Sequence, residues 1–421
     1  MNPRTLKATL VAACLCAALL PAVPAAATAA TAPQPAPSTA RRYLVTGSDT
    51  SGERTKVART GAAIDRVRPD GAIEVSAIPS ELAAIKRLGF TAAPMGGFPR
   101  FAASAQSYHT HAETMAELDR VVAAYPKIAK KFSIGKTYEG RDIVGVKISD
   151  NVATDEDEPE VFYQANIHAR ERITNEQALV FIDTLTKEYG TTERITKLVD
   201  SREFWIIPIL NVDGQIYDMT SDTQAGRMWR KNRQPQATDL NRNYDYKWGC
   251  CGGSSGSPSS ETYRGSSPES APETKAVANF IRSRVVGGKQ QIKIFLDIHS
   301  VAELVLWPFG YTTADTVPGE LSADQEAAHR TIGREVARFN RYTPEQSSDL
   351  YITDGSSDDW TWGTQGIFSY TFEMGGGSFY PAPSQIEALT QVNRDPLLIL
   401  AEYADCPYRA INKQDQYCKS A

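Results

Sequence analysis

Six short apolar runs of strand length constrain the fold of this chain more than any other feature. Stretches with apolar residues at helical spacing separate them, and most of the runs are apolar on both faces. Strands of this kind are buried between two helical layers, since a sheet covered on one face alternates apolar and polar residues. The pattern predicts an α/β fold: a three-layer αβα domain with a mixed central sheet of about eight strands. The runs span residues 141–149, 160–167, 203–210, 292–300, 303–309 and 367–374.

The N-terminus has the three parts of a signal peptide. Basic MNPRTLK precedes apolar ATLVAACLCAALLPAV, and an alanine-rich stretch with small-residue cleavage sites follows. The apolar part is short for a membrane span. We therefore expect residues 1–31 to be removed as a signal peptide and the protein to be secreted into the extracellular space. Lipid attachment at Cys14 is an alternative, because VAAC resembles a lipoprotein processing site, although it lies early in the apolar stretch.

Residues 32–98 are expected to form a small α+β pro-segment. Two strands are predicted at 41–47 and 71–79, and a helix at 80–90. The following sequence, TAAPMGGFPRFAASAQS, is rich in glycine, proline and small residues, as exposed sites of proteolysis often are. We expect cleavage there to release a catalytic domain spanning residues 99–421.

Charge and cysteine content narrow the possible partners. The net charge of -5 gives no reason to expect nucleic acid or an anionic membrane as partner, and we expect a monomer. Two of the six cysteines would leave with the signal peptide. Of the other four, Cys406 and Cys418 have the spacing to close a short C-terminal loop, whereas the pairing of the adjacent Cys250 and Cys251 stays open. The acidic run at 155–160 suits calcium, but we expect it to be a solvated loop.

Polar residues follow three of the apolar runs. His168 and Glu171 come directly after the second run, His299 is near the end of the fourth, and Glu373 is near the end of the sixth. The carboxyl ends of strands in open α/β sheets form ligand sites, so we expect these side chains to converge. Two histidines and one carboxylate are a ligand set for catalytic zinc, with a fourth position for water. A further carboxylate must then accept the proton of the water, and Glu373 is the candidate.

A lone His-x-x-Glu pair would more often be a surface ion pair, so the pair carries little weight by itself. The chain has five histidines. Three of them, His109, His111 and His329, lie in polar or charge-rich helical sequence and are expected to be solvated.

Motifs in the same order extend from Tyr108 to Tyr408, and with them the chain resembles the zinc metallocarboxypeptidases of the carboxypeptidase A/B family. The closest resemblance is to secreted, carboxypeptidase T-like bacterial members. The motifs are HARE at 168–171, NVDG at 211–214, RMWRKNR at 227–233, DLNRNYDYKWG at 239–249, YRGSSPESAPET at 263–274, FLDIHS at 295–300, LYITDGSSDDW at 350–360 and TFEM at 371–374.

The resemblance implies catalytic roles. His168, Glu171 and His299 would hold one Zn²⁺ ion. Glu373 would act as general base and then as general acid. Arg230 would polarise the scissile carbonyl and stabilise the oxyanion. A guanidinium placed where negative charge develops lowers the barrier, which makes this role physically sensible. Alone, RMWRKNR would be interpreted as a solvated basic run. Its occurrence together with the zinc ligands argues against that interpretation.

The resemblance also implies substrate contacts. Asn241 and Arg242 would bind the free C-terminal carboxylate, since a guanidinium forms two parallel charge-assisted bonds to such a group. Tyr351 would close over the substrate, and Arg170 would contact extended substrates. Asp358, seven residues after Tyr351, would form the floor of the specificity pocket.

An acidic pocket floor favours a cationic side chain, so we expect release of basic, or of both basic and apolar, C-terminal residues. The neighbouring Asp359 leaves an alternative open, because either aspartate could be a helix cap or a structural partner.

The predicted function is that of a secreted exopeptidase that hydrolyses the C-terminal peptide bond of peptides and proteins. Two alternatives remain. A zinc amidohydrolase or deacylase would share the His-x-x-Glu site but would not need the carboxylate-binding motifs. A non-catalytic binding module on the same fold should lack a zinc ligand or the base. The three candidate ligands and the candidate base are all present here.

Overall fold

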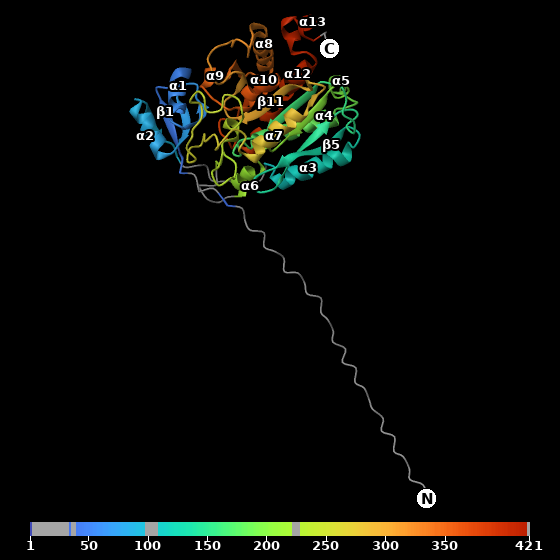
Figure 1. Ribbon diagram of the computed structural model, residues 1–421, viewed down its shortest axis with the longest axis horizontal. Coiled ribbons are helices and arrows are strands. Elements are labelled where there is room, and N and C mark those ends of the chain that lie inside the picture. The colour runs from blue at the N-terminus through green and yellow to red at the C-terminus, as the bar shows by residue number, and fades with distance from the viewer. Residues whose placement is uncertain (2–32, 35–38, 97–107, 221–227, 419–421) are drawn as a thin grey trace. The chain divides into compact units, whose positions relative to one another are not determined.

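The structure, a computed structural model, describes Met1 and residues 33–34, 39–96, 108–220 and 228–418 (Figure 1). The expected signal peptide lies outside these residues, apart from Met1. Residues from Gln34 onward form one compact unit, to which the following description applies. Among the described residues, no helix has the length and apolar character needed to cross a bilayer.

Residues 39–96 form a four-stranded antiparallel sheet in the order β2-β3-β1-β4. The elements are β1 (Arg41–Thr46), α1 (Ser51–Ala58), β2 (Ala63–Val67), β3 (Ile73–Ala77), α2 (Pro79–Arg87) and β4 (Thr91–Pro94). The sequence predicted β1, β3 and α2 but not the other three. Helix α1 carries few apolar residues, and its start depends on a capping box between Thr50 and Glu53.

The central sheet is mixed and has eight strands in the order β13-β12-β14-β11-β7-β8-β6-β5. The four inner strands run parallel, and the strands β12, β6 and β5 bring antiparallel pairings toward the edges. The strands are β5 (Ala129–Lys136), β6 (Asp142–Ile148), β7 (Glu160–Ala165), β8 (Glu203–Ile207), β11 (Ile292–Ser300), β12 (Leu304–Trp307), β13 (Thr343–Gln346) and β14 (Phe368–Met374).

The predicted fold class is confirmed, and all six predicted strands are present. The two strands missing from the prediction, β5 and β13, are the edges of the sheet. Their sequences, AKKFSIGK and TPEQ, carry lysines, a proline and a glutamate. Edge strands contact water along one side, so they lack the apolar pattern that identifies inner strands.

Strand β7 shows how helices come to cover both faces of the sheet. Val161, Tyr163 and Ala165 point into one apolar cluster, whereas Phe162 points into the other. Helices α3, α4, α5, α8 and α12 contribute to the first cluster, and α7 to the second. The helices are α3 (His111–Ala124), α4 (Ile173–Lys187), α5 (Glu193–Val199), α6 (Val212–Thr220), α7 (Pro272–Ser283), α8 (Ala323–Asn340), α9 (Ser347–Leu350), α10 (Ser357–Gln365), α11 (Ile386–Gln391), α12 (Arg394–Glu402) and α13 (Gln414–Tyr417).

The remaining elements are short. A two-stranded hairpin joins α7 to β11, and the described residues also contain four short 3-10 helices. They are β9 (Val285–Val286), β10 (Lys289–Gln290), η2 (Leu240–Arg242), η3 (Pro383–Gln385), η4 (Tyr403–Asp405) and η5 (Pro407–Ile411).

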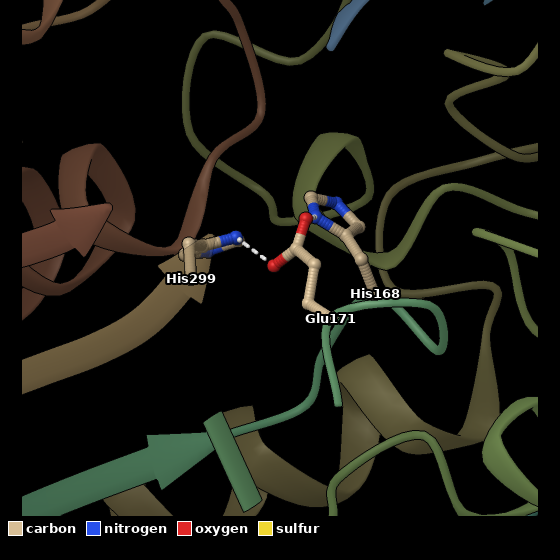
Figure 2. A group of neighbouring side chains, drawn as sticks. All are labelled: His168, Glu171 and His299. Carbon is tan, nitrogen blue, oxygen red and sulfur yellow. Dashed lines mark hydrogen bonds and ion pairs between the residues drawn. The ribbon is translucent and has the colours of Figure 1, made fainter. Parts of the chain in front are cut away.

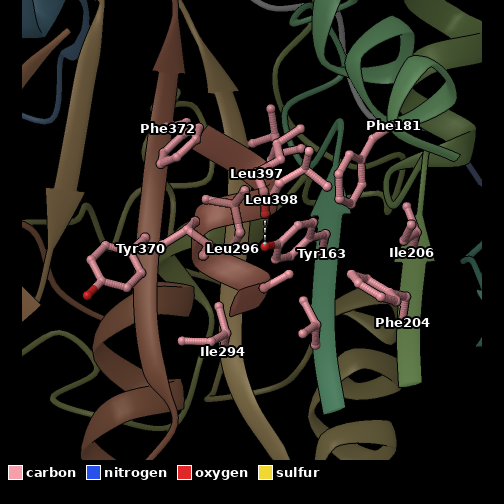
Figure 3. Packing of buried hydrophobic residues seen from close by; sticks show 14 of the residues in the cluster. Tyr163, Phe181, Phe204, Ile206, Ile294, Leu296, Tyr370, Phe372, Leu397 and Leu398 are labelled. Atoms are coloured by element: carbon pink, nitrogen blue, oxygen red, sulfur yellow. Dashed lines mark hydrogen bonds between the residues drawn. The ribbon is translucent and has the colours of Figure 1, made fainter. Parts of the chain in front are cut away.

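The larger apolar cluster holds α12 against the sheet (Figure 3). Leu397 and Leu398 of α12 are fully buried together with Leu296 of β11. Tyr163 is also buried, and its hydroxyl donates to the carbonyl oxygen of Leu397 at 2.8 Å. Burial of each leucine contributes about 1.5–3 kcal/mol, and the tyrosine adds a satisfied polar contact. The inner strands are therefore held rigidly beneath the site described below.

His329 was expected to be solvated, and that prediction is wrong. It is fully buried on α8, with its ring 4.3 Å from that of Phe368 and 4.6 Å from that of Trp362. Burial lowers the pKa of His329 to about 3, so the ring is neutral at physiological pH. Nδ1 lies 2.9 Å from the carbonyl oxygen of Gln325, which satisfies one nitrogen locally.

Candidate active site

His168 and Glu171 lie in the turn that joins β7 to α4. Asn166, at the start of this turn, has a φ of 55°. Its side-chain amide donates to the carbonyl oxygens of His168 and Glu171, at 3.2 Å each. Left-handed backbone at an asparagine, tied by its own side chain, holds both residues at the carboxyl end of the strand.

His299 comes from β11, the neighbouring strand, and meets the same carboxylate. Figure 2 shows the Glu171 carboxylate between the two imidazole rings. Nδ1 of His168 lies 2.8 Å from Oε1 of Glu171, and Nδ1 of His299 lies 3.0 Å from Oε2. All three side chains are buried, and their ligand atoms lie within 4.8 Å of one another.

Each histidine has its other ring nitrogen next to a second carboxylate. Nε2 of His168 lies 3.1 Å from Asp239, and Nε2 of His299 lies 3.3 Å from Asp297. A carboxylate at Nε2 keeps the proton on that nitrogen and leaves the lone pair of Nδ1 for a metal. The sequence prediction did not include these two aspartates. Asp297 stands two residues before His299 in FLDIHS, and Asp239 opens DLNRN, so both motifs contained the signal.

The electrostatics of this cluster suit a cation. Burial acts to raise the pKa of Glu171, but the two histidines hold it well below its usual value. Burial acts to lower the pKa of His299, while Asp297 and Glu171 raise it well above its usual value. Two imidazole nitrogens and one ionised carboxylate oxygen are donors that zinc prefers, so these residues fit a zinc ion.

Glu373 lies on β14 directly opposite His299 of β11 in the sheet register. Burial raises the pKa of Glu373 to about 7, against the lowering effect of His299. A carboxyl group with a pKa near the working pH exchanges protons efficiently in both directions. The position and the pKa both suit an acid–base role.

Arg230 is buried beside the histidine cluster, not solvated. Its Nε and one terminal nitrogen donate to Oδ2 of Asp239, at 3.1 and 2.9 Å. The same aspartate contacts His168 through Oδ1. Asp239 therefore fixes an arginine and a histidine at a set separation.

Asn241 and Arg242 lie in η2, next to the same cluster. Nδ2 of Asn241 is 3.3 Å from Nε2 of His299, and its Oδ1 accepts from the backbone N–H of Ser357 at 2.8 Å. Nε of Arg242 donates to the carbonyl oxygen of Gly253 at 3.1 Å. Both side chains are buried and oriented from more than one direction.

The structure separates the two neighbouring aspartates of α10. Asp358 lines the same cavity as the histidine cluster and accepts from the hydroxyl of Ser347 at 2.8 Å. Asp359 points away and accepts from the backbone N–H groups of Gly310 and Tyr311, at 2.8 and 3.0 Å. Asp359 is thus a structural partner, and Asp358 remains the residue available to a ligand.

One cavity is lined by nine of the ten predicted site residues. They are His168, Glu171, Arg230, Asn241, Arg242, His299, Tyr351, Asp358 and Glu373. Residues 64–67 of the small segment line the same cavity.

Arg170, the tenth predicted residue, does not line that cavity in this structure but contacts the small segment instead. One terminal nitrogen donates to Oδ1 of Asp65 at 2.6 Å, and both side chains are buried. Arg172, for which the sequence suggested no role, donates to Oδ2 of Asp218 at 2.7 Å, and its guanidinium lies over the ring of Tyr380 at 4.3 Å. Arg172 is therefore a structural residue of the turn.

The acidic run at 155–160 is not the fully solvated loop that was expected. Its last residue, Glu160, is fully buried at the start of β7. Arg284 pairs with Glu160 and also with Asp155. An arginine therefore compensates the charge at this end of the sheet.

The cysteine pairs are both disulfides. Cys406 is bonded to Cys418, as their spacing allowed, and the adjacent Cys250 and Cys251 are bonded to each other.

The chain is similar to known proteins in both sequence and structure. A family profile described as "Zinc carboxypeptidase" matches residues 114–395. Over 442 aligned residues the chain is 42% identical to the zinc carboxypeptidase of Saccharothrix mutabilis subsp. capreolus, covering 98% of this chain and 100% of the relative. It is 33% identical over 313 residues to human carboxypeptidase B, covering 71% of each. The crystal structure of thrombin activatable fibrinolysis inhibitor matches with a TM-score of 0.68 and 26% identity, covering 89% of this chain and 100% of that one.

Proposed function

Because this chain belongs to the zinc carboxypeptidase family, it is a metallocarboxypeptidase that hydrolyses C-terminal peptide bonds, and we propose which of its residues perform each step. The supporting observation is that two imidazoles, the Glu171 carboxylate, Glu373, Arg230 and Arg242 line one cavity. Zinc binding, proton transfer and carboxylate recognition can thus act on a single peptide end.

His168, Glu171 and His299 would hold the zinc ion, which supplies Lewis acidity that activates water and polarises a carbonyl. Glu373 accepts a proton from the attacking water and returns it to the departing amine nitrogen. Its pKa near 7 supports both transfers. Arg230 directs its guanidinium at the oxygen that becomes negative, and its contact with Asp239 fixes that direction beforehand.

Asn241 and Arg242 bind the free carboxylate of the substrate, which restricts cleavage to the last residue. Tyr351, on the loop before α10, closes over the substrate, and Arg170 contacts residues further from the scissile bond. Arg170 becomes available for that contact when the small segment leaves, because Asp65 of that segment is its present partner.

The free C-terminus is the feature that tests the proposal. We expect a peptide with a free C-terminal carboxylate to be cleaved at least about 100-fold more efficiently than the same peptide as its C-terminal amide, since a charged bidentate pair is lost. The measurement is kcat/KM for the matched pair. Equal cleavage of both would contradict the carboxypeptidase assignment of Asn241 and Arg242 and favour an amidohydrolase or deacylase.

Asp358 determines, in this proposal, that basic residues are released, either alone or together with apolar ones. Its carboxylate is buried at the cavity wall, where Ser347 is its hydrogen-bond donor. A cationic side chain entering the cavity would compensate that buried charge.

The substitution Asp358→Asn keeps the shape and removes the charge. We expect kcat/KM for a peptide ending in Arg to fall by about 30-fold or more, while that for the same peptide ending in Leu stays within about threefold. Parallel kinetics with the two peptides give the ratio. Loss of activity toward both peptides to the same extent would show that Asp358 supports the site without selecting substrates.

We also propose that residues 1–31 are a signal peptide, 32–98 a pro-segment and 99–421 the catalytic domain, and that the protein is secreted. The support for the pro-segment is its position: Asp65 and Arg66 line the catalytic cavity beside Tyr351. The backbone N–H of Ile352 donates to the hydroxyl of Thr55 at 3.0 Å, which ties the loop after Tyr351 to the small segment. A substrate would have to displace these contacts.

Breaking the Asp65–Arg170 pair tests the inhibitory role of the segment. Asp65→Asn should raise the residual activity of the uncleaved chain by about tenfold, because a buried arginine then lacks its charge partner. Activity after limited proteolysis should be unchanged. Asp70→Asn, at an exposed turn of the same segment, is the matched control. Rates of peptide hydrolysis before and after proteolysis measure the change in residual activity. Separately, N-terminal sequencing of protein recovered from the medium locates the cleavage sites of the signal peptide and of the pro-segment. Unchanged residual activity in Asp65→Asn would refute the proposed inhibition.

A further inference from the structure

The Cys250–Cys251 disulfide joins two consecutive residues in the loop that follows η2. The bond closes a small ring that contains the peptide between them, so it restricts the rotation of that peptide and of the turn attached to it. Cys250 is exposed at the protein surface. Nothing in the catalytic scheme above uses this disulfide.

The turn formed by residues 250–254 holds the arginine proposed to bind the substrate carboxylate. The carbonyl oxygen of Gly253 accepts from Nε of Arg242 at 3.1 Å. Gly253 is buried, and a Cβ placed on it would lie 2.3 Å from the carbonyl carbon of Thr353. This turn therefore packs backbone to backbone against the segment that follows Tyr351. A shift of the Gly253 carbonyl oxygen would disturb this packing.

The same turn also holds Asp354, which lies between Tyr351 and Asp358 in the sequence. Oδ2 of Asp354 accepts from the backbone N–H groups of Cys251 and Gly253, at 3.2 and 2.8 Å. The hydroxyl of Ser254 donates to Oδ1. Asp354 is fully buried, so these donors compensate a charge that has no access to water.

We propose that the Cys250–Cys251 disulfide is a positioning element of the substrate site: it fixes the 250–254 turn, which orients Arg242 and anchors the loop between Tyr351 and Asp358. This inference rests on the proposed role of Arg242. The disulfide touches no substrate itself. It acts through Gly253 and Asp354, so its loss should weaken recognition of the terminal carboxylate more than it slows the chemical step.

Reduction by a dithiol gives a chemical way to remove the constraint. The dithiol donates two electrons and two protons, the sulfur–sulfur bond breaks, and two cysteine thiols and an oxidised dithiol result. The exposure of Cys250 makes this bond accessible to the reagent. Reoxidation should restore the original state.

The test compares the double variant Cys250→Ser/Cys251→Ser with the control Cys406→Ser/Cys418→Ser, both zinc-loaded and activated by limited proteolysis. For a peptide with a free C-terminus, the first variant should show a KM raised by about tenfold, with kcat within about twofold of wild type. Cleavage of the C-terminal amide should not change, so the preference for the free acid should fall by the same factor. The control variant should keep the wild-type preference.

An unchanged preference in the Cys250→Ser/Cys251→Ser variant would overturn the inference, as would equal losses on acid and amide. If that variant does not fold, the control variant is treated with dithiol instead, since Cys250–Cys251 is then its one remaining disulfide among the described cysteines. A reversible rise in KM supports the inference, and an unchanged KM in the reduced protein refutes it. A wild-type protein without preference for the free acid would refute the proposed role of Arg242 itself.

Discussion

Glu373→Gln is expected to lower kcat by about 10²–10⁴-fold, the contribution typical of a positioned acid–base group. The amide keeps the shape of the carboxyl but cannot accept a proton from water. Because Glu373 is not one of the proposed zinc ligands, the zinc content of the variant should match that of wild type. Steady-state kinetics together with metal analysis separate loss of the base from loss of the ion.

Glu345→Gln is the matched control for this variant. Burial raises the pKa of Glu345 to about 7 as well, but its side chain does not line the catalytic cavity. Its substitution should leave kcat within about twofold of wild type, as expected for a change outside the machinery. A Glu373→Gln protein that retains full activity would show that another group takes the proton.

The pH profile gives an independent check on Glu373. Its carboxylate is the active form, so activity is present above its pKa and is lost as the pH falls through it. Burial raises that pKa to about 7 in the absence of a metal, and a nearby zinc ion would lower it through its positive charge. The acid limb of kcat/KM should therefore lie at or below pH 7, and Glu373→Gln should remove it from the residual activity.

His168→Ala is expected to abolish activity through loss of zinc. Removal of a residue that only hydrogen-bonds to a metal ligand typically costs about 10–100-fold in metal affinity, so removal of a direct ligand should cost more than 100-fold. Wild-type protein stripped with a chelator should regain activity when zinc is added, whereas the variant should stay inactive at the same zinc concentration. Zinc content after equilibrium dialysis measures the affinity directly.

His109→Ala is the control for the zinc experiment. His109 is half-buried and pairs with Glu176 at 2.7 Å, and it is neither one of the three grouped metal-ligand candidates nor a residue that lines the catalytic cavity. The His109→Ala variant should bind zinc as tightly as the wild-type protein. Retention of zinc by His168→Ala with unchanged affinity would exclude His168 as a ligand.

The inner half of the fold was readable from sequence because burial on both faces produces continuous apolar runs. The edge strands β5 and β13 were not, since contact with water lets them carry lysine, proline and glutamate. His329 was misjudged for a related reason: its neighbours in sequence are charged, but Phe368 and Trp362, which bury it, come from distant elements.

The residues of the candidate site likewise fall into those that the sequence predicted and those that it did not. His168, Glu171, His299 and Glu373 stood out because each lies at or after the end of an apolar strand and because together they match a zinc ligand set with a base. Asp297 and Asp239 did not, because their function depends on which nitrogen of a histidine they face. Spacing along the chain contains no information on that orientation.

The sequence by itself determined the family, the three-layer α/β fold and the residues that converge on one strand edge, since periodicity and motif order record local burial and chemistry. Only the tertiary structure decided that Asp358 lines the cavity while Asp359 caps a backbone turn, and that Arg170 pairs with Asp65. Asp358 and Asp359 are the same residue type at neighbouring positions and differ only in the direction in which the side chain points. That direction is set by packing between segments that are far apart in the chain.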